Sequence, residues 1–482
     1  MSIGELFDTC DATGIAAAVK RGEVTPGELL DEALRRVATL NPQLNAVTML
    51  QEDVARRLIA DGLPEGPLTG VPFLLKDLGA EAIDFPSNNG SRLFAETRYA
   101  KDSAIYARLK AAGLVTFGRT TSPEGGVGPT TESAVYGGPT RNPWNPGHTP
   151  GGSSGGAAAA VASGMVPVAH GSDGGGSVRI PASSCGLFGF KATRARLPDG
   201  PYVGEGWAGM AIDGFLTRSV RDTATLLDAT NGIDLGAPYS PPPLEASFGA
   251  ALGRRERLTI AFTTTNLTGD PIHPDCVAAV EAAAKLLESL GHTLVEARPV
   301  ADTRGMMAAW TKVVACGTAL SVEGAARRRG RPIAEDEIED VARSAIAYAR
   351  GVSGADYLES VNKVHAYGRE MADFFAAGGY DLLLTATLAE PPARLGRFDH
   401  AGRDYVEYRM GKGMVFDYSP FTAAFNASGQ PAASLPLHWT ADGLPVGIHL
   451  AAPYGHDERL LGVCARLEEA APWFSRRPSI RA

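Results

Sequence analysis

Cysteine and clustered positive charge are both scarce in this sequence, and each scarcity argues against a class of protein. Only five of the 482 residues are cysteines, scattered without C-x-x-C pairs or metal-ligand spacing. They are expected to be free thiols in a reducing compartment, and neither a metal nor a cofactor is expected. The net charge is −9 without a basic stripe, so a nucleic-acid partner is not expected either.

A long hydrophobic run and a leader segment are also missing. The N-terminal residues lack the basic and apolar regions of a signal peptide. The longest stretch of small apolar residues, 157–169, is interrupted by Ser163, Gly164 and Pro167 and is too short to cross a bilayer. We therefore expect a cytoplasmic protein without a membrane partner.

No linker, low-complexity tract or internal repeat divides the chain. Hydrophobic residues make up 44% of it, which is ample for a large buried core. We therefore expect one domain over 1–482. Its expected parts are N-terminal helices in 1–65, a core with the chemical motifs in about 66–230, and a remainder, 231–482, that completes the sheet and the substrate pocket.

Helical and strand-like segments alternate along the chain. Residues 10–60 and most of 300–377 have helical spacing, whereas the short apolar runs within 68–78 and 381–384 are strand candidates. The turn at 441–444, between two apolar runs, predicts a β-hairpin and therefore a mixed sheet. The alternation predicts an α/β fold with a large mixed sheet layered against helices.

One lysine and two serines stand out. Lys76 ends the apolar run 71–75, Ser153 lies in the Gly-Gly-Ser-Ser-Gly-Gly segment 151–156, and Ser177 follows three glycines. Serine is a poor nucleophile until a neighbouring base removes its proton, and lysine can be that base. Glycine-rich turns let backbone N–H groups approach a developing oxyanion. These residues indicate a serine hydrolase that uses lysine instead of histidine.

The sequence resembles the amidase signature family over most of its length. Residues 70–77 are similar to the family's lysine strand, 151–156 to its serine- and glycine-rich motif, and 171–182 to its nucleophile segment. Residues 425–432 and 442–447 are similar to its C-terminal pattern. The resemblance implies that family's fold, a large twisted mixed sheet with helices on both faces.

The resemblance also implies a role for each site residue. Ser177 is the expected nucleophile and Lys76 the base, while Ser153, expected after a cis peptide bond, bridges them. Lys76 must be neutral to accept a proton, so its pKa should be lowered by burial. The expected oxyanion donors are the backbone N–H groups of Gly174, Gly175, Gly176 and Ser177. The residues expected to brace the loop are Ser154, Asp173 and Arg179.

Gly174 departs from the family pattern, because many members have threonine or isoleucine at this position. The missing side chain is expected either to widen the pocket for the acyl group or to loosen the loop. The segments 119–140, 200–212, 310–320 and 410–426 are expected to form the walls of the substrate pocket. Within them, Cys316 and Phe416 are expected to line it.

Among amidase signature enzymes, the segments around the three motifs most resemble 6-aminohexanoate-cyclic-dimer hydrolases and urethanases. The resemblance implies hydrolysis of C–N bonds in uncharged small-molecule amides, cyclic or oligomeric ones among them, with esters accepted as well. Carbamate hydrolysis on the same three residues is the alternative. A homodimer is compatible with the sequence.

Two other interpretations use the same residues. Gly151-x-Ser153-x-Gly155 fits the nucleophile elbow of an α/β-hydrolase, with His438, His449 and His456 available downstream. That reading leaves Lys76 and the glycine run before Ser177 without a role. A transamidase-type subunit that needs partner chains is the other interpretation, although the acidic net charge offers no support for it.

Overall fold

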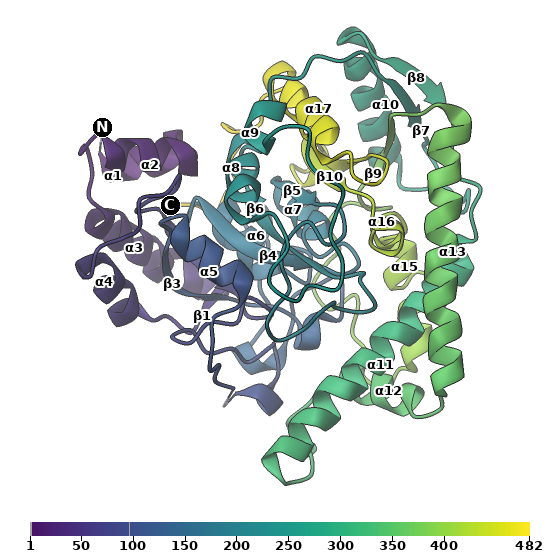
Figure 1. Cartoon of the computed structure of the whole chain (residues 1–482), viewed down its shortest axis with the longest axis horizontal. Helices are drawn as coiled ribbons and strands as arrows, with labels where there is room; N and C mark the ends of the chain where they lie inside the picture. The colour runs from purple at the N-terminus through teal and green to yellow at the C-terminus, as the bar shows by residue number, and fades with distance from the viewer. Residues whose placement is uncertain (1, 96) are drawn as a thin grey trace.

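The computed structural model describes residues 2–95 and 97–482, and in them one eleven-stranded sheet runs through the molecule (Figure 1). In sheet order the strands are β1 (Val47–Thr48), β3 (Val115–Thr120), β2 (Pro72–Lys76), β4 (Val168–Asp173), β6 (Ile212–Thr217), β5 (Phe188–Lys191), β10 (Ala432–Trp439), β11 (Pro445–Ala451), β9 (Leu382–Ala386), β7 (Thr259–Phe262) and β8 (Thr293–Glu296).

The sheet is mixed, which confirms the predicted class. Strands β3, β2 and β4 are parallel neighbours, as are β9, β7 and β8. Antiparallel pairs join these two groups through β6, β5, β10 and β11. The predicted hairpin is present: β10 and β11 pair around the turn at 441–444, with Ala433 opposite Leu450.

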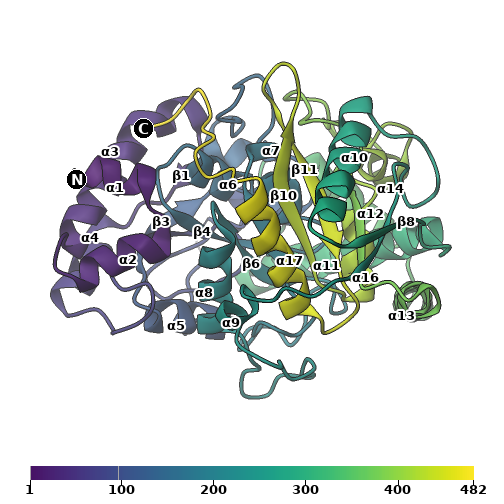
Figure 2. The ribbon, with the colours of Figure 1, turned by 90° about the horizontal axis from the view of Figure 1, so that it is seen from above.

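Helices cover both faces of the sheet. The chain passes from β2 through α5 (Ala104–Ala111) to β3 and returns through α6 (Gly155–Ala162) to β4. Crossovers between parallel strands are almost always right-handed, so these opposite directions place α5 and α6 on opposite faces. Helix α5 packs against α8 (Val220–Thr230), whereas α6 packs against α7 (Arg179–Cys185). Figure 2 shows α8 beside α9 (Phe248–Ala251) and α17 (Asp457–Ala470), which contact each other.

The N-terminal helices gather at the β1 end of the molecule (Figure 1). They are α1 (Ile3–Thr9), α2 (Ala12–Lys20), α3 (Pro26–Leu44) and α4 (Glu52–Ala60). The sequence predicts the start of α3, because Thr25 caps it, Pro26 takes the first helical position and Glu28 completes a capping box.

Long helices occupy the opposite end (Figure 1). They are α10 (Pro274–Ser289), α11 (Thr303–Arg329), α12 (Asp340–Ala349) and α13 (Gly354–Gly378), followed by the short helices α14 (Tyr405–Met410), α15 (Val415–Tyr418) and α16 (Thr422–Ser428). In the described part of the chain, α11 alone is long and apolar enough to cross a membrane by length and composition. Half of the most apolar 18-residue stretch of α11 is buried inside the protein. The helix packs against α12, α13, α14 and α16, and this packing accounts for its apolar residues.

The structure corrects the expected extent of one strand. The apolar run 166–169 predicts a strand that ends before a turn at 171–179, whereas β4 continues to Asp173. The reason is its antiparallel partner β6, which the sequence pattern does not indicate. Gly171 lies opposite Gly214 and Asp173 lies opposite Ile212, so the ladder holds the chain extended to the last residue before the glycine run.

Candidate active site

The three sequence motifs meet at the carboxyl ends of neighbouring parallel strands. Strand β2 ends at Lys76 and β4 at Asp173, while β3, on the other side of β2, leads into the loop that carries Ser153. In open α/β sheets, ligands bind at this edge because the loops that follow the strands converge there. The register aligns Lys76 with Thr120 of β3 and Leu74 with Ala169 of β4.

Lys76 is completely buried and contacts two hydroxyl groups. Its Nζ donates to Ser153 Oγ at 2.7 Å and to Ser172 Oγ at 2.9 Å. Burial lowers the pKa of Lys76 to about 7, although the carboxylates of Asp213 and Asp173 act in the opposite direction. A large part of the population therefore holds a neutral amine at neutral pH. Sequence reasoning gave Ser172 no role, although it lies just before the braced Asp173.

The Gly152–Ser153 peptide bond is cis, in agreement with the expectation. Residue 152 has to be glycine, because an added Cβ would lie 2.4 Å from the carbonyl oxygen of Thr130. Ser154, which follows Ser153, donates from its Oγ to the carbonyl oxygen of Ser172 at 3.3 Å. Its backbone N–H donates to the carbonyl oxygen of Ser177 at 3.2 Å. Ser154 therefore ties the Ser153 loop to the Ser177 loop.

A buried ion pair holds the loop after β4. The Asp173 carboxylate accepts from the backbone N–H groups of Gly176 (2.7 Å) and Val178 (3.2 Å), and from Arg179 Nε (3.0 Å) and Nη2 (2.9 Å). Burial opposes ionisation of Asp173, yet the Arg179 guanidinium holds its pKa well below the usual range. Asn426 completes the network by accepting from Arg179 at 2.7 Å and donating to Asp173 at 2.9 Å. Sequence reasoning noted Asn426 only within a C-terminal pattern.

This network changes the expected set of oxyanion donors. The N–H of Gly176 is already committed to Asp173, so it is not free for a ligand. In a planar trans peptide, the C=O of one residue and the N–H of the next point in opposite directions. A hydrogen bond to the carbonyl oxygen of one residue therefore fixes the direction of the N–H of the next residue. Trp310 Nε1 donates to the carbonyl oxygen of Gly174 at 3.0 Å, and Ile180 N donates to that of Gly176 at 2.7 Å. These two bonds fix the directions of the Gly175 and Ser177 N–H groups, and both residues line the pocket below.

Gly174 does not leave open space as expected. An added Cβ would lie 2.5 Å from Cζ3 of Trp207, so the indole ring occupies the place where a side chain would be. At Gly175 an added Cβ would lie 2.9 Å from Cζ2 of Trp310. The two indole rings contact each other edge to face, with centroids 5.6 Å apart. The glycines allow aromatic rings to pack directly on the loop, which narrows the site.

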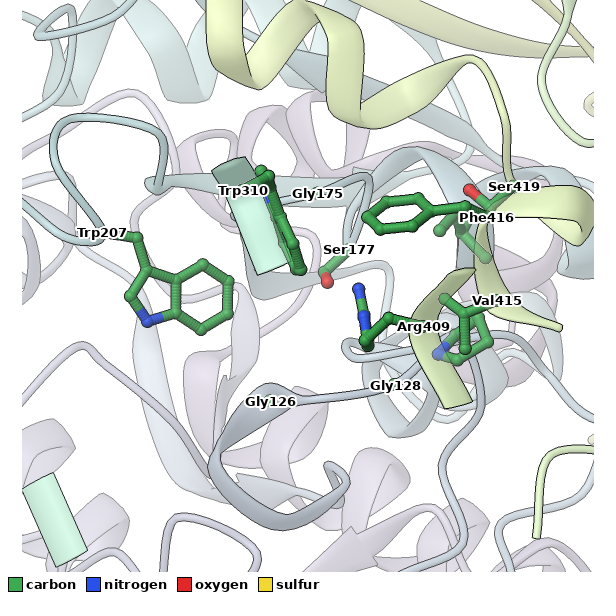
Figure 3. Close-up of a pocket in the computed structure, with 12 residues that line it drawn as sticks. Gly126, Gly128, Gly175, Ser177, Trp207, Trp310, Arg409, Val415, Phe416 and Ser419 are labelled. Atoms are coloured by element: carbon green, nitrogen blue, oxygen red, sulfur yellow. The ribbon is translucent and has the colours of Figure 1, made fainter. Parts of the chain in front are cut away.

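A narrow pocket opens onto Ser177 (Figure 3). The residues around it are Gly126, Gly128, Pro129, Gly175, Ser177, Ile180, Trp207, Trp310, Arg409, Val415, Phe416 and Ser419. Phe416 lines the pocket as expected, whereas Cys316 is not among these residues. Cys316 is six positions after Trp310 on α11, about 240° around the helix, and so belongs to another face.

The expected brace residues meet in space, and the histidine-based reading finds no support. His449 Nε2 lies 3.0 Å from Arg179 Nη1, whereas the hydrogen-bond partner of Ser153 Oγ in the described residues is Lys76. Within residues 2–95 and 97–482, no group of three or more His, Cys, Asp or Glu side chains is placed to hold a metal ion.

Known proteins resemble this chain over its whole length. A family model described as Amidase matches residues 28–461. The chain is 37% identical to the 6-aminohexanoate-cyclic-dimer hydrolase of Paenarthrobacter ureafaciens, over 98% of this chain and 96% of that protein. It is 32% identical to an acylamidase of Rhodococcus erythropolis, over 97% of each. The solved structure of 6-aminohexanoate cyclic dimer hydrolase complexed with substrate has a TM-score of 0.92 at 35% identity, with 99% of this chain and 100% of that chain covered.

Proposed function

Because this chain belongs to the amidase signature family and is an amidase that hydrolyses C–N bonds, we propose that it does so through an acyl-enzyme on Ser177. Lys76 is the base in this proposal and Ser153 passes protons between the two. The observation that carries it is the contact of the buried Lys76 amine with Ser153 Oγ at 2.7 Å, together with a pKa of about 7.

Attack begins with two proton transfers. Neutral Lys76 takes the proton of Ser153, and Ser153 takes the proton of Ser177. Ser177 Oγ then forms a bond to the carbonyl carbon of the substrate, and the carbonyl electrons move to oxygen. Ser172 keeps accepting a hydrogen bond from Lys76, so the ammonium that forms has a partner at 2.9 Å.

The developing oxyanion accepts hydrogen bonds from the backbone N–H groups of Gly175 and Ser177. Both are directed by bonds to neighbouring carbonyl groups, so they need no reorganisation when charge develops. Preorganised donors of this kind contribute about 3–4 kcal/mol each to transition-state stabilisation.

The intermediate collapses when protonated Lys76 returns its proton through Ser153 to the leaving nitrogen. The C–N bond breaks, the amine departs, and the acyl group stays on Ser177. Water then attacks the acyl carbon while Ser153 and Lys76 accept its proton, and the carboxylic acid leaves as Ser177 regains a proton. A carbamate passes through the same steps by way of a carbamoyl-enzyme.

The pocket favours substrates with apolar chains. Trp207, Trp310 and Phe416 present ring surface beside Ser177. Two relatives are a cyclic-dimer hydrolase and an acylamidase by name, and we propose medium-length aliphatic amides, cyclic or oligomeric ones among them, as substrates here too. Uncharged amides are the expected substrates, but this pocket also contains a charged group, the guanidinium of Arg409.

A substrate panel with the purified chain alone tests this proposal. We expect turnover of hexanoyl-p-nitroanilide, with a phenyl ester and an aryl carbamate as comparison substrates. A sulfonyl fluoride should label Ser177 once, as shown by intact mass and peptide mapping. Label on Ser153 would reverse the two serine roles, and activity only after addition of partner proteins would favour the transamidase-type alternative.

A further inference from the structure

Arg409 is a buried cation in the wall of the proposed active site. It lies on α14 and lines the pocket with Ser177, and 4% of the residue is exposed. Figure 3 shows its side chain extending toward Ser177. Its Cζ lies 4.5 Å from the ring centroid of Trp310 and 5.0 Å from that of Phe416. The guanidinium is therefore held by aromatic faces within reach of a bound substrate.

In the described part of the chain, no carboxylate or carbonyl group accepts a hydrogen bond from this guanidinium. Its Nε is buried without a partner. Other buried arginines do have acceptors for their guanidinium groups. Arg179 has Asp173, and Arg119 donates to backbone carbonyl groups such as that of Lys76 at 2.6 Å.

An uncompensated buried cation is costly, and arginine does not escape this cost by losing its proton. Burial lowers the pKa of Arg409, and Tyr405 and Tyr408, which act on it in the opposite direction, are both neutral in the physiological range. Contact with Trp310 and Phe416 offsets part of the cost, since cations are attracted to ring faces. The planar fork of donors remains free on the pocket side, and this geometry matches a carboxylate.

We propose that Arg409 is an anion-binding subsite that takes a carboxylate carried by the substrate, a proposal that rests on Ser177 being the nucleophile of this pocket. The substrate class is therefore an amide with an apolar chain that ends in a carboxylate. The carboxylate belongs either to the acyl half or to the amine half, and the shared chemistry is a bidentate pair with guanidinium. This refines the sequence-based expectation of uncharged amides.

Binding to a chain that cannot turn over substrate tests the subsite apart from the chemistry. In a Ser177→Ala background, calorimetry compares glutaryl-p-nitroanilide with its methyl ester for the acyl half. N-hexanoyl-6-aminohexanoate and its methyl ester serve for the amine half. We expect at least one carboxylate probe to bind tenfold or more tightly than its ester, and the pair that shows the difference identifies the half.

Arg409→Met in the same background should abolish that preference, because methionine fills similar space without charge. Arg409→Lys keeps the charge without the planar fork and should restore part of it. Equal binding of acid and ester to the Arg409 chain, or a preference that survives Arg409→Met, would overturn the subsite. If Arg409→Met does not fold by circular dichroism, the acid-to-ester ratios of Arg409 and Arg409→Lys decide. Turnover by the unaltered chain is a separate measurement, so failure of the subsite is distinguishable from failure of the proposed hydrolysis.

Discussion

Two lysines of this chain have the same electrostatic character but lie in different surroundings. Lys76 ends β2 at the pocket side, whereas Lys191 ends β5 further along the sheet. Burial lowers the pKa of each to about 7, and the carboxylate of Asp173 acts against burial at both. Lys76 contacts two serine hydroxyl groups, but Lys191 Nζ donates to the carbonyl oxygen of Ala192 at 2.9 Å. A lowered pKa alone therefore does not identify a base; the hydroxyl group beside it does.

The largest difference in kcat between the two sites is expected when each lysine is replaced in turn. Lys76→Ala should lower kcat on the order of 10³–10⁶-fold, because Lys76 is the hydrogen-bond partner of Ser153 Oγ among the described residues and is the proposed acceptor of its proton. Lys191→Met should keep kcat within about tenfold, since Lys191 touches no reacting group. Steady-state kinetics on hexanoyl-p-nitroanilide, with circular dichroism as the folding control, measure both. A similar loss in the two variants would mean that buried charge, and not proton transfer, underlies the effect.

The next test removes the negative charge of Asp173, which acts on both lysines. Asp173→Asn keeps the shape of the side chain but leaves Arg179 buried without its carboxylate. Removing one partner of a buried ion pair costs roughly 3–5 kcal/mol, so the free energy of unfolding should fall by about that amount. Urea denaturation of the variant and the parent measures the difference. A loss below about 1 kcal/mol would show that Asn426 and the backbone, and not the ion pair, hold the loop.

The motifs were predictable from sequence as individual residues, whereas the pocket wall was predictable only as segments of the chain. Lys76, Ser153 and Ser177 are marked by glycine-rich turns and an apolar strand, which are local signals. Strands β5 and β6 were missed because small residues such as Gly189 and Gly214 weaken their pattern.

The sequence does not show which side chains of the expected wall segments reach the pocket. Trp207 comes from a loop, Trp310 from the middle of α11 and Arg409 from α14, and only the fold brings them together. The Gly174 expectation went wrong for the same reason, since the sequence around residue 174 says nothing of the indole that packs there.

The pH dependence of turnover tests the lowered pKa of Lys76. A base must be neutral, so lowering the pKa of Lys76 from its usual value near 10.4 to about 7 moves the rise of activity to neutral pH. We expect kcat/KM to increase about tenfold between pH 6 and pH 8 and then to level off. A profile that is flat from pH 6 to pH 8, or one that falls over this range with the protein folded, would contradict this value for Lys76.

The smallest expected effect concerns Ser172, whose hydroxyl group contacts Lys76, whereas Lys191 contacts a carbonyl oxygen instead. Ser172→Ala removes one hydrogen-bond partner of Lys76 and leaves Ser153 in place. A hydrogen bond of this kind contributes about 1 kcal/mol, so kcat should fall about fivefold. Ser172→Thr retains the hydroxyl group and is the matched control. Unchanged kcat in Ser172→Ala would show that Ser153 alone positions the amine.

The rate at which a sulfonyl fluoride labels Ser177 tests, without any substrate, whether Lys76 activates this serine. Intact-mass spectrometry follows labelling from pH 5.5 to pH 9 in the parent, Lys76→Ala and Lys191→Met. We expect a labelling rate that rises with an apparent pKa of about 7 in the parent and in Lys191→Met, and a slow rate without that titration in Lys76→Ala. Equal labelling of Ser177 in Lys76→Ala and the parent at pH 8 would contradict this expectation.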